Sequence, residues 1–145
     1  MMKGAKTSVV VVPCSGIGKS FGSVSREAAY ELCDELRPAQ THLVALSRLV
    51  IGEEQAREKV RTSPAVTIDG CKLMCAAALV RQSGGTIALE VAVLDAYRRH
   101  KELKPEGIAD LNEAGRKLAR VLAEEIADKI DDLGDREGGE GRGHA

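Results

Sequence analysis

Four apolar segments alternate with amphipathic helical patterns along this chain, and few folds are compatible with that order. The segments lie at Thr7–Val12, Thr41–Leu46, Ala65–Ile68 and Thr86–Val93. Short continuous apolar runs are typical of strands buried on both faces of a parallel sheet. We therefore predict an α/β fold with a single small three-layer domain. Its mostly parallel sheet would have about four strands, with helices on both faces.

The helical segments repeat their apolar residues with the 3.6-residue period. They are expected at about 23–37, 52–62, 71–83 and 110–133. Ser23 or Ser25 can cap the first helix, which ends before Pro38, and Gly134 ends the long C-terminal one. The segment Thr86–Val93 alternates apolar with smaller or polar residues. It predicts a half-exposed strand, or a strand that runs into a short helix through Tyr97.

A length of 145 residues suits one domain. We expect residues 1–134 to form a single α/β metal-binding domain. Residues 135–145 are rich in glycine and charge and have almost nothing to bury, so they predict a disordered tail.

Composition argues against several classes of partner. Aromatic residues make up 2% of the chain and the net charge is −1, so base-stacking platforms and basic runs are both missing, and we expect no nucleic-acid partner. No apolar stretch approaches the length of a membrane span, and the run Val9–Val12 is too short for a signal peptide. We therefore expect a cytoplasmic protein that binds no membrane, in a compartment where thiols stay reduced.

Three of the four cysteines fall where strands are expected to end. Cys14 follows the first apolar run, and Cys71 and Cys75 follow the third. The carboxyl ends of parallel strands meet at one edge of the sheet, where ligands bind. Cys71 and Cys75, at i and i+4 on the expected helix, would share a helix face. A helix start at Cys71 would favour its thiolate. The sequence predicts a metal site of Cys14, Cys71 and Cys75.

The fourth cysteine, Cys33, lies on the apolar stripe of the first helix, far along it from the strand ends. It is therefore expected to pack in the core. Three thiolates leave a fourth position for water, Asp69 or substrate, the arrangement of catalytic zinc. Zinc is the expected cofactor, although cysteines also ligate iron–sulfur clusters. The three histidines have no ligand spacing and are interpreted as surface or linker residues.

The loop after the first strand is rich in glycine. The segment 13–20 nearly matches the phosphate-binding pattern GxxxxGK[ST], but Pro13 replaces the first glycine, which argues against nucleotide hydrolysis. Backbone N–H groups of such a loop, with a lysine, can still hold an anion. That candidate anion loop comprises Ser15, Gly16, Gly18 and Lys19, and the alternative is a tight turn.

Two motifs of this chain resemble those of the DGC family, which is named for its Asp-Gly-Cys motif. They are Pro13-Cys14-Ser15-Gly16 and Ile68-Asp69-Gly70-Cys71 with Cys75, and the resemblance covers roughly Val9 to Gly85. It implies zinc binding through four cysteines, of which Cys14, Cys71 and Cys75 match. The segment Leu43–Ser47, where the remaining family cysteine is expected, contains none. A site of three thiolates agrees with this departure.

Three functions remain open from the sequence. The first is a zinc-binding protein of unknown biochemical role, whose function would be metal binding itself or a metal-assisted step on a small ligand. The second is thiol redox or persulfide chemistry at Cys14, Cys71 or Cys75. The third is a non-enzymatic accessory protein whose helix 110–133 docks a partner or a second copy, as a homodimer. The alternative for the apolar stripe of that helix is a contact with the core of its own domain.

Overall fold

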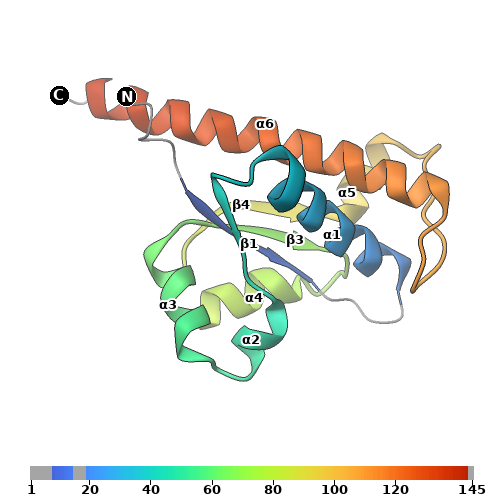
Figure 1. Cartoon of the computed structure of the whole chain (residues 1–145), viewed down its shortest axis with the longest axis horizontal. Helices are drawn as coiled ribbons and strands as arrows, with labels where there is room; N and C mark the ends of the chain where they lie inside the picture. Colours follow the sequence, from blue (N-terminus) through green and yellow to red (C-terminus); the bar gives the residue numbers. More distant parts are fainter. Residues whose placement is uncertain (1–7, 15–18, 144–145) are drawn as a thin grey trace.

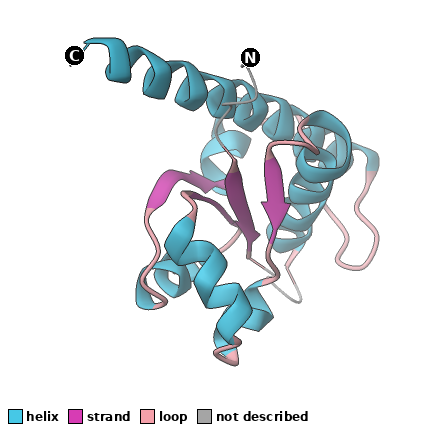
Figure 2. Ribbon diagram, turned by 60° about the vertical axis from the view of Figure 1, so that its left-hand side comes forward, coloured by secondary structure: helices cyan, strands magenta, loops and turns pink. Residues whose placement is uncertain are grey.

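The sheet is parallel throughout, as predicted. The computed structural model describes the backbone of residues 8–14 and 19–143, and the side chains of these segments as far as Gly134. Four strands are present in this part of the chain: β1 (Val9–Pro13), β2 (Thr41–Leu43), β3 (Ala65–Asp69) and β4 (Ile87–Ala92). Their order is β2-β1-β3-β4, and every neighbouring pair runs parallel. Figure 2 shows the strands enclosed by helices on both sides.

Helices cover both faces and complete the three layers. They are α1 (Ser20–Tyr30), the π-helix η2 (Glu31–Leu36), α2 (Leu46–Val50), α3 (Glu54–Thr62), α4 (Cys75–Gln82), α5 (Val93–Arg99) and α6 (Glu113–Gly143). Helices α2, α3 and α4 lie on one face, and α1 with α6 lies on the other (Figure 1). Strand β4 runs directly into α5, which confirms the second of the two predicted alternatives for that segment.

Alternate residues of β1 enter two separate cores. Val9 and Val11 pack with α1, α5 and α6, whereas Val10 and Val12 pack with α2, α3 and α4. All four valines are at most 2% exposed. This two-sided burial is the physical reason for the continuous apolar run in the sequence.

The first helix begins earlier than predicted, and the two serines that were expected to cap it lie inside it. Helix α1 starts at Ser20. The Ser25 hydroxyl is buried in the helix and donates to the carbonyl of Ile68, over 2.6 Å. The Ser23 hydroxyl donates to the carbonyl of Ile108, over 2.5 Å. Both serines therefore join α1 to distant segments instead of capping it.

The apolar stripe of the long helix is a core contact of its own domain. Leu118, Leu122, Ile126 and Ile130 are each at most 1% exposed and belong to the core on the α1 side of the sheet. The helical backbone continues to Gly143, so the predicted end at Gly134 is too early. The disorder of residues 135–145 and the homodimer both stay predictions.

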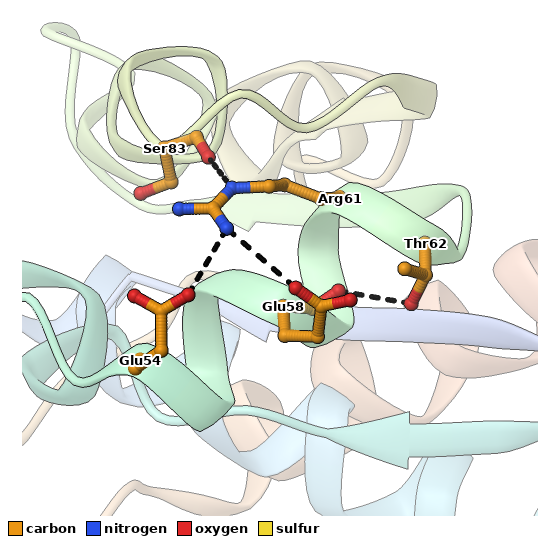
Figure 3. Close-up of polar contacts among 5 residues, drawn as sticks. All are labelled: Glu54, Glu58, Arg61, Thr62 and Ser83. Carbon is orange, nitrogen blue, oxygen red and sulfur yellow. Dashed lines mark hydrogen bonds and ion pairs between the residues drawn. The ribbon is translucent and has the colours of Figure 1, made fainter.

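Helix α4, which carries Cys75 at its start, is held at its other end by Arg61 of α3 (Figure 3). The Arg61 Nε donates to the carbonyl of Ser83 over 3.2 Å. Its Nη1 lies 3.2 Å from a carboxylate oxygen of Glu54 and 3.6 Å from one of Glu58. The two carboxylates orient the guanidinium toward a carbonyl at the C-terminal end of α4.

Among the helices of the described residues, none combines the length and the apolar character that crossing a bilayer requires.

Candidate metal centre

The cysteines meet at the point where the strand order reverses. From β1 the chain passes to β2 on one side and then returns to β3 on the other. In open parallel sheets this reversal leaves a crevice beyond the carboxyl ends of the two central strands. Cys14 directly follows β1, and Gly70 and Cys71 directly follow β3. The fold therefore brings together thiols that lie 57 positions apart in sequence.

The three thiols form one compact cluster. The Sγ of Cys71 lies 3.9 Å from that of Cys14 and 3.4 Å from that of Cys75. All three sulfur atoms are within 4.8 Å of one another. Cys14 is buried, at 3% exposure, and the other two are half-buried. The predicted convergence of these side chains is confirmed.

The local structure that produces this cluster differs from the prediction. Cys71 lies in a turn, and α4 begins at Cys75. Met74, immediately before the helix, has φ 54° and ψ 54°, a left-handed conformation that interrupts a right-handed helix. The two thiols therefore meet across a turn and not along a helix face. The helix start that was expected at Cys71 falls at Cys75.

Asp69 defines where that helix begins. Its side chain is 1% exposed, and its two carboxylate oxygens accept hydrogen bonds from the backbone N–H groups of Ala76, over 2.7 Å, and Ala77, over 3.1 Å. Burial raises the pKa of this carboxyl, and the two N–H groups oppose that rise only in part. Because both oxygens serve the free N–H groups of α4, we assign Asp69 to capping and not to the fourth metal position.

Gly70 allows the turn to pass against α1. A Cβ atom at this position would lie 2.4 Å from the carbonyl oxygen of Phe21 and 2.7 Å from the backbone nitrogen of Gly22. Both contacts are with backbone, which cannot rotate away as a side chain can. Only glycine therefore fits between β3 and the first turn of α1.

The thiols differ in acidity because of their surroundings. Burial, followed by the nearby charge of Cys71, raises the pKa of Cys14 to about 11. For Cys71, partial burial raises the pKa, but hydrogen bonds from the N–H groups of Cys75 and Leu73 and the contacts with both neighbouring thiols lower it overall. The contact with Cys71, together with burial, raises the pKa of Cys75. Thiols this close resist ionising together unless a cation is present.

Other candidate residues lie elsewhere. Cys33 belongs to η2 and packs, half-buried, against the core on the α1 side, which agrees with its predicted core role. His100 contacts Glu125 of α6, its Nε2 lying 3.1 Å from a carboxylate oxygen. In the candidate anion loop, Ser15, Gly16 and Gly18 lie outside the described residues. Lys19 is exposed beside the first turn of α1, so that loop stays a prediction.

The fold and the cluster together define a small doubly wound α/β protein with a three-thiol site at its switch point. The family model of the DGC domain matches residues 10–114, well over half of the chain. The chain therefore belongs to the DGC-domain family, as its two motifs predicted. No curated protein and no solved structure matches it.

The three thiols were predictable from the sequence, but the residues that position them were not. The capping by Asp69 and the close approach at Gly70 both depend on contacts with other elements. The only signal for either was their place in the Asp-Gly-Cys motif.

Proposed function

We propose that this protein binds one Zn²⁺ ion through the thiolates of Cys14, Cys71 and Cys75. The observation that supports the proposal is the spacing of the three sulfur atoms. Tetrahedral zinc with Zn–S bonds of about 2.3 Å needs sulfur atoms roughly 3.8 Å apart. The separations here are 3.9 Å and 3.4 Å, with all sulfurs within 4.8 Å. We further infer a cytoplasmic location, where these thiols would stay reduced.

The protein's own residues prepare the site in separate ways. Buried Cys14 anchors it beneath the turn, the Asp69 cap holds Cys75 at the start of α4, and Gly70 brings Cys71 close to α1. With Asp69 engaged, the fourth position is left to water or a bound ligand. Bound zinc would supply a Lewis acid that polarises such a ligand.

Elemental analysis of protein purified without chelator tests the proposal. We expect about one zinc per chain, and a large loss of metal in Cys71→Ser. Cys33→Ser is the matched control, because Cys33 lies outside the cluster, and it should retain the metal. A folded, metal-free protein with three reactive thiols would overturn the proposal. A brown, iron-containing sample would replace zinc by an iron–sulfur cluster.

Thiol chemistry is the second candidate function, and the lowered pKa of Cys71 favours it. A Cys71 thiolate could take the outer sulfur of a persulfide donor, which leaves as a thiolate. With the Cys75 sulfur 3.4 Å away, it could instead form a transient disulfide with Cys75 while a disulfide substrate is reduced to two thiols. Alkylation at pH 6 separates the two functions. Rapid modification of Cys71 alone in the purified protein supports thiol chemistry. If all three clustered thiols are protected from alkylation and a chelator removes that protection, the result supports metal binding.

A further inference from the structure

A cavity of about 850 Å³ opens beside the thiol cluster. It lies beyond the carboxyl ends of β3 and β4, between the turn 70–74, the start of α5 and the start of α1. Its size is typical of sites for small organic molecules. Cys71 belongs to its wall, whereas Cys14 and Cys75 do not. The cavity therefore adjoins the candidate metal site on the side of one ligand.

Apolar side chains make up much of the wall of this cavity. Phe21, Leu73, Met74 and Leu94 contribute to it, with Ala92 at the end of β4. Leu73 is 82% exposed, so this large apolar side chain lies in water at the edge of the cavity. Met74 takes its left-handed conformation in the same wall. Exposed apolar surface and an unusual backbone conformation at one place are features that a bound ligand would explain.

The charged residues of the wall favour an anion. Lys19, Lys72 and Arg98 contribute three cations. Of the two carboxylates, Asp69 is buried as the cap of α4, and Asp95 lies 3.2 Å from the guanidinium of Arg98. Within the described segments, Lys19 and Lys72 make no ion pair. The cavity thus combines an apolar lining with an excess of one positive charge, from three cations and two carboxylates.

We propose that this cavity binds a small organic carboxylate with an apolar chain. The chain would lie against Phe21 and Leu94, and the carboxylate near Lys19 and Arg98. The position of the ligand beside a metal ion rests on the proposed function, because Cys71 is common to both sites. Binding of the carboxylate to the cavity itself requires no metal.

Titration of the purified protein with sodium acetate, butyrate and hexanoate, followed by backbone amide NMR, tests this inference. We expect saturable shifts of Leu73, Leu94 and Arg98. Affinity should rise with each added methylene, by up to about fourfold where the group is fully buried. Hexanol and inorganic phosphate should bind at least about tenfold more weakly than hexanoate. Hexanol lacks the carboxylate, and phosphate lacks the apolar chain. Affinity that does not depend on chain length, or phosphate binding as strong as hexanoate binding, would overturn the inference.

Paired variants locate the carboxylate. The double variant Lys19→Gln with Arg98→Gln should weaken hexanoate binding about tenfold. The control, Lys59→Gln with Arg120→Gln, removes the same charge at positions outside the cavity and should leave the affinity unchanged. Equal weakening by both pairs would mean that net charge alone attracts the anion, which contradicts a defined site.

The cobalt-loaded protein separates this inference from the proposed function. A change in the visible spectrum of bound Co²⁺ on adding hexanoate supports the adjacency of cavity and metal. If cobalt binds but hexanoate shifts no cavity residue, the inference fails and metal binding stands. If no metal binds but the NMR shifts appear, the cavity inference holds and the proposed function fails.

Discussion

Asp69, Gly70 and Cys71 are consecutive but act in three physically different ways. The Asp69 carboxylate caps α4, and the Cys71 thiol belongs to the cluster. Gly70 has no side chain, so the backbone of α1 can pack directly against it. The chemical character of Cys71 was predictable from the sequence because a thiol near strand ends is a candidate ligand. The roles of Asp69 and Gly70 were not, since each depends on a neighbour that only the fold supplies.

Replacement of Gly70 by alanine should test the close approach at the residue scale. The new Cβ would lie 2.4 Å from the carbonyl oxygen of Phe21, so the turn after β3 must move away from α1. We expect Gly70→Ala to lower the free energy of unfolding by about 1–3 kcal/mol, the usual cost of overpacking. Urea titration measures the difference.

Lys72→Ala is the control for that variant, because Lys72 lies in the same turn and is exposed. It should change stability by less than about 0.5 kcal/mol. A Gly70→Ala protein as stable as this control would show that α1 does not press against the turn.

At the scale of elements, the orientation of α4 depends on both of its ends. Asp69 caps the first turn, and Arg61 of α3 donates to the Ser83 carbonyl at the other end (Figure 3). The helix was predicted from its apolar period, but its start was placed at Cys71, four residues early. The error arose because the cap comes from a strand residue and not from the residue before the helix.

Arg61→Gln should remove the hydrogen bond from the guanidinium to the Ser83 carbonyl at the C-terminal end of α4. Since Arg61 is 38% exposed, we expect a loss of only about 0.5–1 kcal/mol in the free energy of unfolding. Metal content should not change, because Cys75 lies at the opposite end of the helix. Arg120→Gln, on the exposed side of α6, is the matched control for thermal unfolding. Metal loss in Arg61→Gln would reveal that the hydrogen bond from Arg61 to Ser83 also positions the thiols.

The contact between α5 and α6 should depend on pH. Glu125 of α6 accepts from Arg99 over 2.6 Å and lies 3.1 Å from the ring of His100. Burial raises the pKa of Glu125, but the hydrogen bonds from His100 and Arg99 outweigh it and hold the pKa below its usual 4.5. A carboxyl with a lowered folded-state pKa stabilises the fold above the unfolded-state pKa. That stabilisation is lost as pH falls through the folded-state value.

Glu125→Gln should therefore cost up to about 1 kcal/mol of stability at pH 7. The difference from the natural protein should shrink as pH falls below 4.5. Urea titrations at pH 7 and pH 3 measure it, with Glu124→Gln, an exposed neighbour, as the control. An equal cost at both pH values would mean that the charge of Glu125 contributes nothing.

At the scale of the whole molecule, α6 closes one of the two cores. Its stripe of Leu118, Leu122, Ile126 and Ile130 is buried between Glu113 and Gly134. A chain that ends at Gly134 should therefore keep its fold. We expect its midpoint of thermal unfolding to change by less than about 2 °C. Calorimetry of the two chains gives the comparison.

Leu122→Ala in the full chain is the destabilised reference with which the thermal unfolding of the shortened chain is compared. Removing a fully buried leucine costs about 2–5 kcal/mol, so the unfolding midpoint should fall by roughly 10 °C. If the unfolding midpoint of the shortened chain falls as far as that of Leu122→Ala, residues 135–145 contribute to the folded domain. The prediction of a disordered tail would then be wrong.

The amino-acid sequence was enough to predict the alternation of strands and helices, the parallel sheet, and the cysteines that follow β1 and β3. These features are local, since they follow from the period of apolar residues and the nature of single side chains. Three other features emerge only in the folded protein: α4 begins at Cys75, Asp69 caps it, and a charged cavity lies beside Cys71. Each of these depends on contacts between segments far apart in sequence, which no local pattern encodes.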